Sequence, residues 1–361
     1  MQDAVSSGTC AGMQLAGVYR GSRFELAVGE RARGVPMSAD GMLNWQSTAK
    51  PVAAVAIGLL VDRGLCDVEA PVSRYVPEFA QNGKGGVSVS MLLTHTAGVP
   101  FCDLHLLAHS PPAPWATFID TICASTLEWT PGTRAGYHPT SAWYMLGEIV
   151  RRVDGRPFDR YVRESIFEPL GMVGCYIGMS PDEYASCAPR IGGLWNTAGG
   201  LQGAGADPLS SEGGLVEPEW VMACIPGGNL RGPACEVVKL FEMLLCGGTA
   251  ADGRTPFLRP STAALLVRRH RVGMHDAVQG FVCDWGLGVF VGAQTLLGNH
   301  ASKDAFGHGG AQSSVGWGDP VHDVAVAVAA NGKPGPDRNL ERMNRICTSL
   351  YEDLGLAGGR A

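Results

Sequence analysis

Alternating apolar and polar residues mark both ends of the chain as strands. Residues 13–34, "MQLAGVYRGSRFELAVGERARG", alternate on both sides of the turn "RGSR", which predicts a two-stranded antiparallel hairpin. Near the other end, "FVCDWGLGVFVG", "SSVGWGDP" and "VAVAVAANG" are typical of strands, and "RNLERMNRICTSLYEDLG" predicts a final helix. The two ends of the chain are therefore expected to supply a sheet.

The segments between these strands have helical spacing instead. Apolar residues dominate from Ser47 to Leu60, and "DRG" closes the run, which predicts a buried helix that is apolar on every side. Further along, "TSAWYMLGEIVRRVDG" and "ACEVVKLFEMLLCGG" also have helical spacing, the second with a glycine stop. Glycine- and proline-rich loops separate these helices.

This order of elements predicts an α+β fold. We expect an antiparallel sheet formed by both chain ends and flanked by helices, with an inserted, mostly helical lobe. The predicted α/β domain comprises residues 1–72 and about 263–361, and the helical domain about 73–262. The active site is expected between the two.

Composition narrows the function classes. The chain has 45% hydrophobic and 17% charged residues, a formal net charge of −6 and no long Lys/Arg block, which argues against nucleic acid and membrane surfaces as partners. No apolar run is long enough to span a bilayer, and the N-terminus lacks the features of a signal peptide. Eleven scattered cysteines indicate reduced thiols. We therefore expect a cytoplasmic location.

Ser47 and Lys50 are the strongest candidates for chemistry. Residues three apart share a helix face, so the hydroxyl and the amine can approach each other. Pro51 requires the helix to begin at or beside Ser47, where backbone N–H groups are free. Burial and the helix dipole disfavour the charged form of Lys50, so its amine could accept the Ser47 proton. In the alternative reading, Ser47 only caps the helix and Lys50 reaches solvent.

Three longer passages extend this pattern. They are "PMSADGMLNWQSTAKPVAAVAIGLLVDRG" with "VSVSMLLTHTAGVP", "WTPGTRAGYHPTSAWYMLGEIVRRVDG", and "DAFGHGGAQSSVGWGDP". In this order, across residues 36–350, they resemble the serine β-lactamase-like superfamily of class C β-lactamases, related carboxylesterases, D-aminopeptidases and transacylases. The resemblance implies catalysis with no cofactor and no metal ion.

The resemblance also implies individual roles. Ser47 would be the acylated nucleophile, Lys50 its partner base, and Tyr137 the residue that shuttles a proton to and from the leaving group. The oxyanion hole would be the backbone N–H groups of Ser47 and Ala311, the latter on an edge strand facing the helix start. Whether Lys50 or Tyr137 is the acylation base stays open. Near two cations the pKa of Tyr137 is expected to fall; alternatively, Tyr137 only anchors its loop.

Two departures from the superfamily pattern bear on the substrate. His308, Gly309 and Gly310 stand where a Lys-Thr-Gly motif is usual, and no amide stands two places after Tyr137. We expect His138 and the His308–Gly310 segment to contact substrate. A neutral imidazole binds an anionic β-lactam poorly, so these changes favour an ester or a related carbonyl as the acyl donor.

The predicted function is serine-dependent acyl transfer from a small molecule to water, an amine or an alcohol. The protein would be a carboxylesterase or a transacylase, and a role in secondary metabolism is one option. Its oligomeric state stays open. The alternatives are a β-lactamase or D-amino-acid peptidase, and a non-catalytic binding protein that retains the fold.

A zinc site is a further alternative. His105 and His109 lie one helical turn apart, with His95 and Cys102 nearby. No glutamate stands inside the histidine pair to act as a base, which argues against this alternative.

Overall fold

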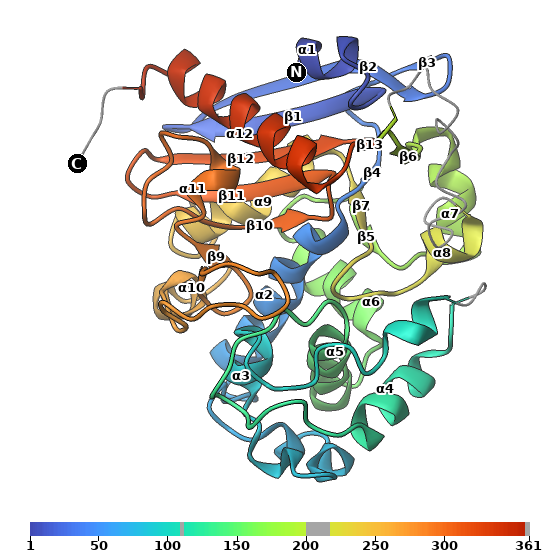
Figure 1. The fold of residues 1–361 in the computed structure, drawn as a ribbon, viewed down its shortest axis with the longest axis vertical. Coiled ribbons are helices and arrows are strands. Elements are labelled where there is room, and N and C mark those ends of the chain that lie inside the picture. The colour runs from blue at the N-terminus through green and yellow to red at the C-terminus, as the bar shows by residue number, and fades with distance from the viewer. Residues whose placement is uncertain (109–111, 200–216, 358–361) are drawn as a thin grey trace.

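An antiparallel sheet built from both ends of the chain dominates the upper half of the molecule (Figure 1). The computed structural model describes residues 1–108, 112–199 and 217–357. Within them, eight strands pair in the order β3-β2-β1-β12-β11-β10-β9-β8. Their bounds are β1 (Gly12–Tyr19), β2 (Ser22–Ala32), β3 (Val35–Pro36), β8 (Asp284–Trp285), β9 (Phe290–Val291), β10 (Phe306–Gly310), β11 (Ser314–Asp319) and β12 (Val324–Ala330).

The central pairing joins the two chain ends. β1 and β12 run antiparallel, from Met13 opposite Ala330 to Tyr19 opposite Val324, and β1 also forms the expected hairpin with β2. The predicted sheet of both termini is therefore confirmed.

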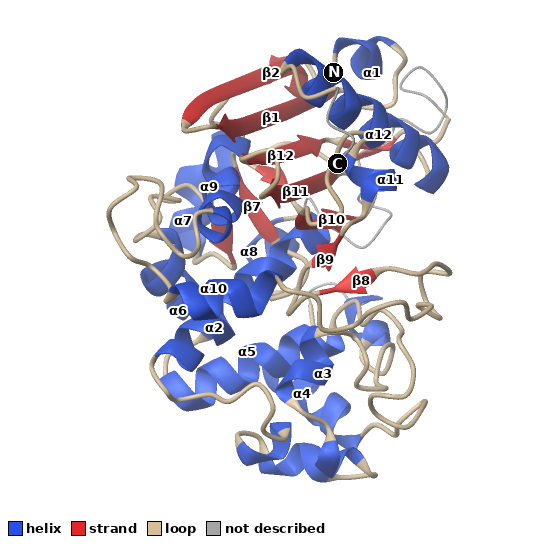
Figure 2. Cartoon of the chain, turned by 90° about the vertical axis from the view of Figure 1, so that its left-hand side faces the viewer, coloured by secondary structure: helices blue, strands red, loops and turns tan. Residues whose placement is uncertain are grey.

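Helices cover both faces of this sheet (Figure 2). On one face lie α11 (Gln294–Leu297) and α12 (Pro336–Asp353), the predicted final helix; on the other lies α9 (Ala234–Leu245). Every residue of β12 is buried. Its alternation sends the valines and Ala330 into one core with Met343 and Cys347 of α12, and the other three alanines into another core with Phe241 of α9.

The position of α9 differs from the predicted domain division. Residues 234–245 were expected in the helical lobe, yet α9 packs against β1, β11 and β12. The reason is steric: the sheet presents small residues to α9, and a Cβ on Gly316 would lie 2.1 Å from the Phe241 ring. Helical periodicity predicts an apolar face but not the partner that covers it.

The helical lobe surrounds α2 (Lys50–Asp62), the predicted buried helix. Every residue from Lys50 to Leu60 is buried, and α2 contacts α5 (Ser141–Asp154), α6 (Phe158–Val162) and α10 (Pro260–Val267). The other helices are α1 (Gln2–Ser6), α3 (Val89–Leu93), α4 (Trp115–Ala124), α7 (Pro181–Cys187) and α8 (Pro218–Met222). The short strands are β4 (Leu43–Asn44), β5 (Tyr176–Ile177), β6 (Trp195–Asn196), β7 (Leu230–Gly232) and β13 (Gly332–Lys333).

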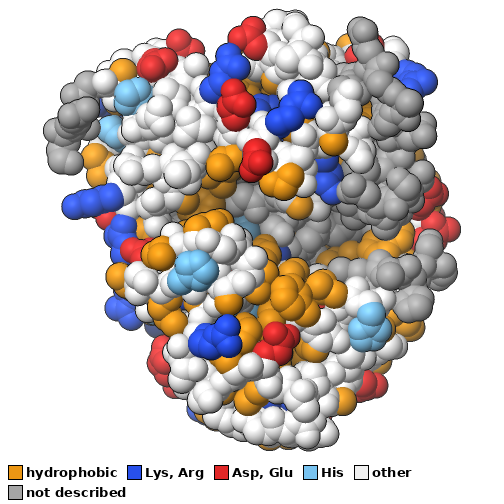
Figure 3. Space-filling model, viewed as in Figure 1, with side chains coloured by type: hydrophobic (Ala, Val, Ile, Leu, Met, Phe, Trp, Pro, Cys, Tyr) orange, Lys and Arg blue, Asp and Glu red, His pale blue; other side chains and the backbone are white. Residues whose placement is uncertain are grey.

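The surface is hollowed where the sheet meets the lobe, and hydrophobic side chains gather around this hollow (Figure 3). In the part of the chain that the structure describes, no helix combines the length and apolarity needed to cross a bilayer. All eleven cysteines are free thiols.

Candidate active site

Ser47 and Lys50 meet where the chain enters α2. Ser47 lies in the short 3₁₀ helix η1 (Gln46–Ala49), and Lys50 is the first residue of α2. The Lys50 Nζ donates to Ser47 Oγ at 3.1 Å and to the Gly227 carbonyl oxygen at 2.7 Å. The predicted contact is confirmed, and no side chain caps α2. Because Lys50 is 0% exposed, the reading in which its amine reaches solvent is wrong.

Burial sets the protonation of Lys50. The loss of solvent lowers the pKa of this amine well below its ordinary value. Its Nζ lies 5.0 Å from the ring centroid of Tyr137 and 5.4 Å from that of Trp143. A neutral amine beside a hydroxyl can accept the hydroxyl proton, which is what activation of Ser47 requires.

The backbone just before Ser47 has an unusual conformation. Gln46 has a φ of 50°, in the left-handed region that non-glycine residues rarely adopt. Its N–H donates to Asn44 Oδ1 at 2.7 Å, and Asn44 Nδ2 donates to Asn229 Oδ1 at 3.3 Å. This chain of amides stabilises the turn that presents Ser47. The sequence analysis missed Asn44, Gln46 and Asn229, because no local pattern indicates a left-handed residue there.

The second half of β10 faces η1. The sequence predicts that this strand lies at the edge of the sheet. Because β9 pairs only with Phe306 and Gly307 of β10, β10 is an edge strand only from His308 onward. Thr48 Oγ1 donates to the His308 carbonyl at 3.2 Å. A Cβ on Gly310 would lie 2.3 Å from the Trp45 carbonyl oxygen, so glycine is needed for this close approach.

The two backbone groups predicted for the oxyanion hole come from these facing elements. Ser47 belongs to η1, and Ala311 directly follows β10 as an exposed residue of the turn into β11. Among the described residues, neither N–H has a hydrogen-bond acceptor. Both groups are free to bind a developing oxyanion.

The Tyr137 ring lies beside the Lys50 amine, but the prediction that the pKa of Tyr137 falls is wrong. Burial raises the pKa of the Tyr137 phenol above its ordinary value, a hydrogen bond with Ser47 opposes that rise, and the charge of Asp276 adds to it. The expected fall in pKa assumed two cations nearby, whereas burial disfavours both a charged lysine and a phenolate. Tyr137 is therefore a neutral phenol that can donate a proton.

His138 was predicted to contact substrate, and its geometry contradicts this. Its Nε2 accepts from the Val99 N–H at 3.0 Å, and its Nδ1 donates to the Gly136 carbonyl at 2.6 Å. Both ring nitrogens are used within the protein, and the side chain is 0% exposed. Burial lowers the pKa of His138 to about 4. His138 is a neutral residue that supports the loop ahead of α5.

His308 differs from His138 in having one ring nitrogen without a partner among the described residues. Its Nδ1 lies 2.7 Å from the Gly309 carbonyl oxygen, and among the described residues its Nε2 has no hydrogen-bond partner. Its ring centroid is 6.1 Å from that of Tyr137. Burial, reinforced by the nearby Lys50, lowers the pKa of His308 to about 3. The third motif thus presents a neutral imidazole instead of a cation.

The zinc alternative gains no support. His109 lies outside the described residues, and the described residues contain no group of three His, Cys, Asp or Glu side chains that could hold a metal ion. His95 Nδ1 accepts from the His138 N–H at 3.0 Å, so this nitrogen is already used.

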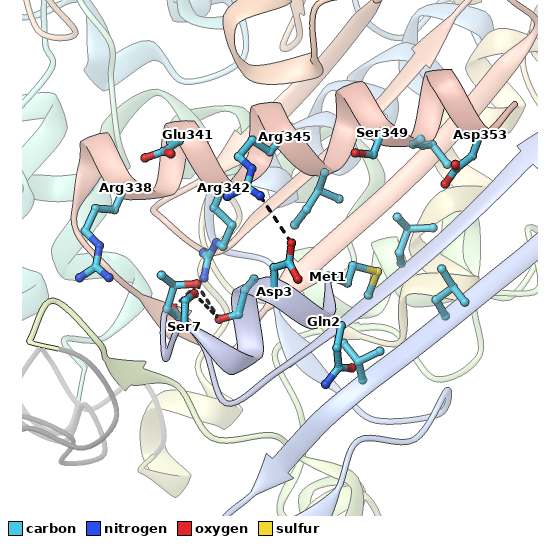
Figure 4. A pocket seen from close by; sticks show the side chains of 17 residues that line it. Met1, Gln2, Asp3, Ser7, Arg338, Glu341, Arg342, Arg345, Ser349 and Asp353 are labelled. Atoms are coloured by element: carbon cyan, nitrogen blue, oxygen red, sulfur yellow. Dashed lines mark hydrogen bonds and ion pairs between the residues drawn. The ribbon is translucent and has the colours of Figure 1, made fainter. Parts of the chain in front are cut away.

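A cavity of about 710 Å³ lies elsewhere, between α1, β1, β2 and α12 (Figure 4). An ion pair of Asp3 with Arg345, at 3.5 Å, crosses it. Ser47, Lys50 and Tyr137 are not among the residues that line it. It is therefore separate from the candidate active site.

In this site a serine is hydrogen-bonded to a buried lysine at the start of a central helix, beside an antiparallel sheet. This arrangement is typical of serine enzymes that transfer acyl groups. The chain belongs to the beta-lactamase family, whose model matches residues 1–349. It is an enzyme of the serine hydrolase and acyltransferase type, as the sequence analysis predicted.

Three similar proteins illustrate this membership. The esterase/beta-lactamase LipL of Mycobacterium tuberculosis is 27% identical over 331 residues, which cover 84% of this chain and 72% of LipL. A penicillin-binding protein homologue from Caulobacter crescentus has a TM-score of 0.78 and 28% identity, covering 97% of this chain and 95% of its own. A family VIII carboxylesterase has a TM-score of 0.79 and 26% identity, with coverages of 96% and 95%.

Proposed function

We propose that the protein is an esterase or transacylase that carries its acyl group on Ser47. The observation that carries this proposal is the 3.1 Å contact between Lys50 Nζ and Ser47 Oγ at a fully buried amine. Lys50 accepts the Ser47 proton while Oγ attacks the ester carbonyl. The N–H groups of Ser47 and Ala311 stabilise the oxyanion.

A proton then reaches the leaving group. Tyr137, a neutral phenol that interacts with Ser47, donates its proton to the departing alkoxide and recovers one from the protonated Lys50 amine, whose Nζ lies 5.0 Å from the Tyr137 ring centroid. Water, an amine or an alcohol attacks the acyl-enzyme by the reverse relay, and the acyl product leaves. This scheme uses both candidate bases, with Lys50 as the acceptor in acylation.

Esters are favoured as donors because the third motif carries no positive charge. The pKa of His308, lowered to about 3, keeps its ring neutral at physiological pH, so an anionic β-lactam has no cation there. Activity toward β-lactams is the second candidate, supported by the similarity to LipL, whose name includes both activities. A cytoplasmic location and a role in secondary metabolism stay predictions.

Turnover of p-nitrophenyl butyrate tests the proposal. Ser47→Ala should lower kcat by several orders of magnitude, since loss of the nucleophile in serine enzymes reduces it by up to ~10⁶. Adding an amine or alcohol and analysing products separates the two activities: a new amide or ester identifies a transacylase, and free butyrate alone identifies an esterase. Near-normal turnover by Ser47→Ala, or turnover of nitrocefin but not of esters, would contradict the proposal.

A further inference from the structure

The backbone around Tyr137 is held at three consecutive N–H groups. The Gly136 N–H donates to the His95 carbonyl at 3.0 Å. The Tyr137 N–H donates to Asp276 Oδ1 at 2.9 Å, and the His138 N–H donates to His95 Nδ1 at 3.0 Å. Because all three groups are bound, the peptide planes on both sides of Tyr137 are fixed, and with them the direction in which the phenol leaves the backbone.

Asp276 is a buried carboxylate whose two oxygens are both satisfied. Oδ1 also accepts from the N–H groups of Val278 at 3.1 Å and Gln279 at 3.0 Å. Oδ2 forms an ion pair with Arg271 Nη1 at 3.2 Å, and both side chains are almost entirely buried. Burying a carboxylate is unfavourable unless it is paired and hydrogen-bonded. The loop that carries Asp276 therefore holds its carboxylate in a fixed position. The hydrogen bond from the Tyr137 N–H to this carboxylate fixes the Tyr137 backbone in turn.

Arg271 connects Asp276 to a third segment of the chain. Its Nη1 also donates to the Thr94 carbonyl at 3.0 Å, and its Nη2 donates to the Cys283 carbonyl at 3.1 Å. Its guanidinium lies 5.2 Å from the ring centroid of Trp285. Thr94 precedes His95, so Arg271 links the two residues that bind the backbone around Tyr137, His95 and Asp276.

We propose that Asp276, fixed by Arg271, is a positioning residue for Tyr137. It aims the phenol at the point where a proton passes between Ser47 and the leaving group. The inference rests on the proposed function, because it concerns the same proton relay. Asp276 touches no reacting atom, so its effect on the reaction passes through Tyr137.

A double-mutant cycle tests this dependence. The acylation rate is measured from the p-nitrophenol burst with p-nitrophenyl butyrate in wild type, Asp276→Ala, Tyr137→Phe and the double variant. Asp276→Ala should lower the rate by ~10²-fold, the lower end of a general acid–base contribution, with little change in KM. In the Tyr137→Phe background the same substitution should produce little further loss. Asp276→Asn, which keeps the Oδ1 acceptor, should recover part of the rate.

Glu242→Ala is the matched control. Glu242 is also a buried acid paired with an arginine, accepting from Arg23 Nη2 at 2.8 and 2.7 Å, but it lies on α9 behind the sheet. The Glu242→Ala substitution should lower the urea midpoint of unfolding and leave the acylation rate of the folded protein close to that of wild type.

Several outcomes would overturn the inference. Equal losses from Asp276→Ala in the two backgrounds would indicate a merely structural role, and an unchanged rate would remove any role. If Asp276→Ala does not fold, Asp276→Asn completes the same cycle with the same criterion. A wild type whose release of p-nitrophenol does not depend on Ser47 would refute the proposed function itself, which distinguishes that failure from a failure of the Asp276 inference alone.

Discussion

At the scale of single residues, burial decides the chemistry. Three titratable side chains lie in the candidate site, those of Lys50, Tyr137 and His308. Burial lowers the pKa of Lys50 and of His308 and raises that of Tyr137. Burial therefore favours the neutral amine of Lys50, the neutral phenol of Tyr137 and the neutral imidazole of His308. Such a set can pass a proton between its members without separating charge in a medium that solvates charge poorly.

The lowered pKa of Lys50 predicts a pH-dependent stability. The folded protein releases the Lys50 proton at a pH where the unfolded chain, with a pKa near ~10.4, still binds it. The unfolding free energy therefore rises with pH between these two values. Relative to Lys50→Met, wild type should gain up to ~1.4 kcal/mol per pH unit within that window, measured by urea unfolding. A difference between the two proteins that is constant with pH would show that Lys50 is charged in the folded state.

At the scale of elements, the site depends on how closely η1 approaches β10. Ser314 Oγ donates to the Trp45 carbonyl at 2.7 Å and lies 3.0 Å from Thr48 Oγ1. These hydroxyls join the turn that carries Ser47 to the sheet. The gap between the two backbone groups proposed for the oxyanion hole therefore depends on side chains other than those proposed to be catalytic.

Gly310→Ala tests this approach. The added Cβ would lie 2.2 Å from Ser314 Oγ and 2.3 Å from the Trp45 carbonyl, so η1 must move away from β10. A displacement near ~1 Å at a catalytic group lowers rates by about 10²-fold, and we expect that loss in kcat for p-nitrophenyl butyrate. Gly309→Ala, whose Cβ meets only the end of the Leu296 side chain at 2.9 Å, should lose much less. Equal effects of the two substitutions would contradict this account of the approach.

At the scale of the whole molecule, the sequence predicts what local patterns encode. The terminal sheet follows from alternation, and the Ser47–Lys50 contact follows from a spacing of three on a helix. The neutral state of Tyr137 and the buried role of His138 depend on packing that distant segments supply. Asp276 binds a backbone group 139 residues away, and a lone aspartate in a loop carries no signal of such a partner. The packing of α9 on the sheet is hidden for the same reason.

The most direct test of the central claim is the mass of the trapped acyl-enzyme. After brief incubation with p-nitrophenyl butyrate and an acid quench, the intact protein should gain one butyryl group. Peptide fragmentation should place that group on Ser47, and Ser47→Ala should gain none. A butyryl group on another side chain, or none on wild type during active turnover, would contradict the account.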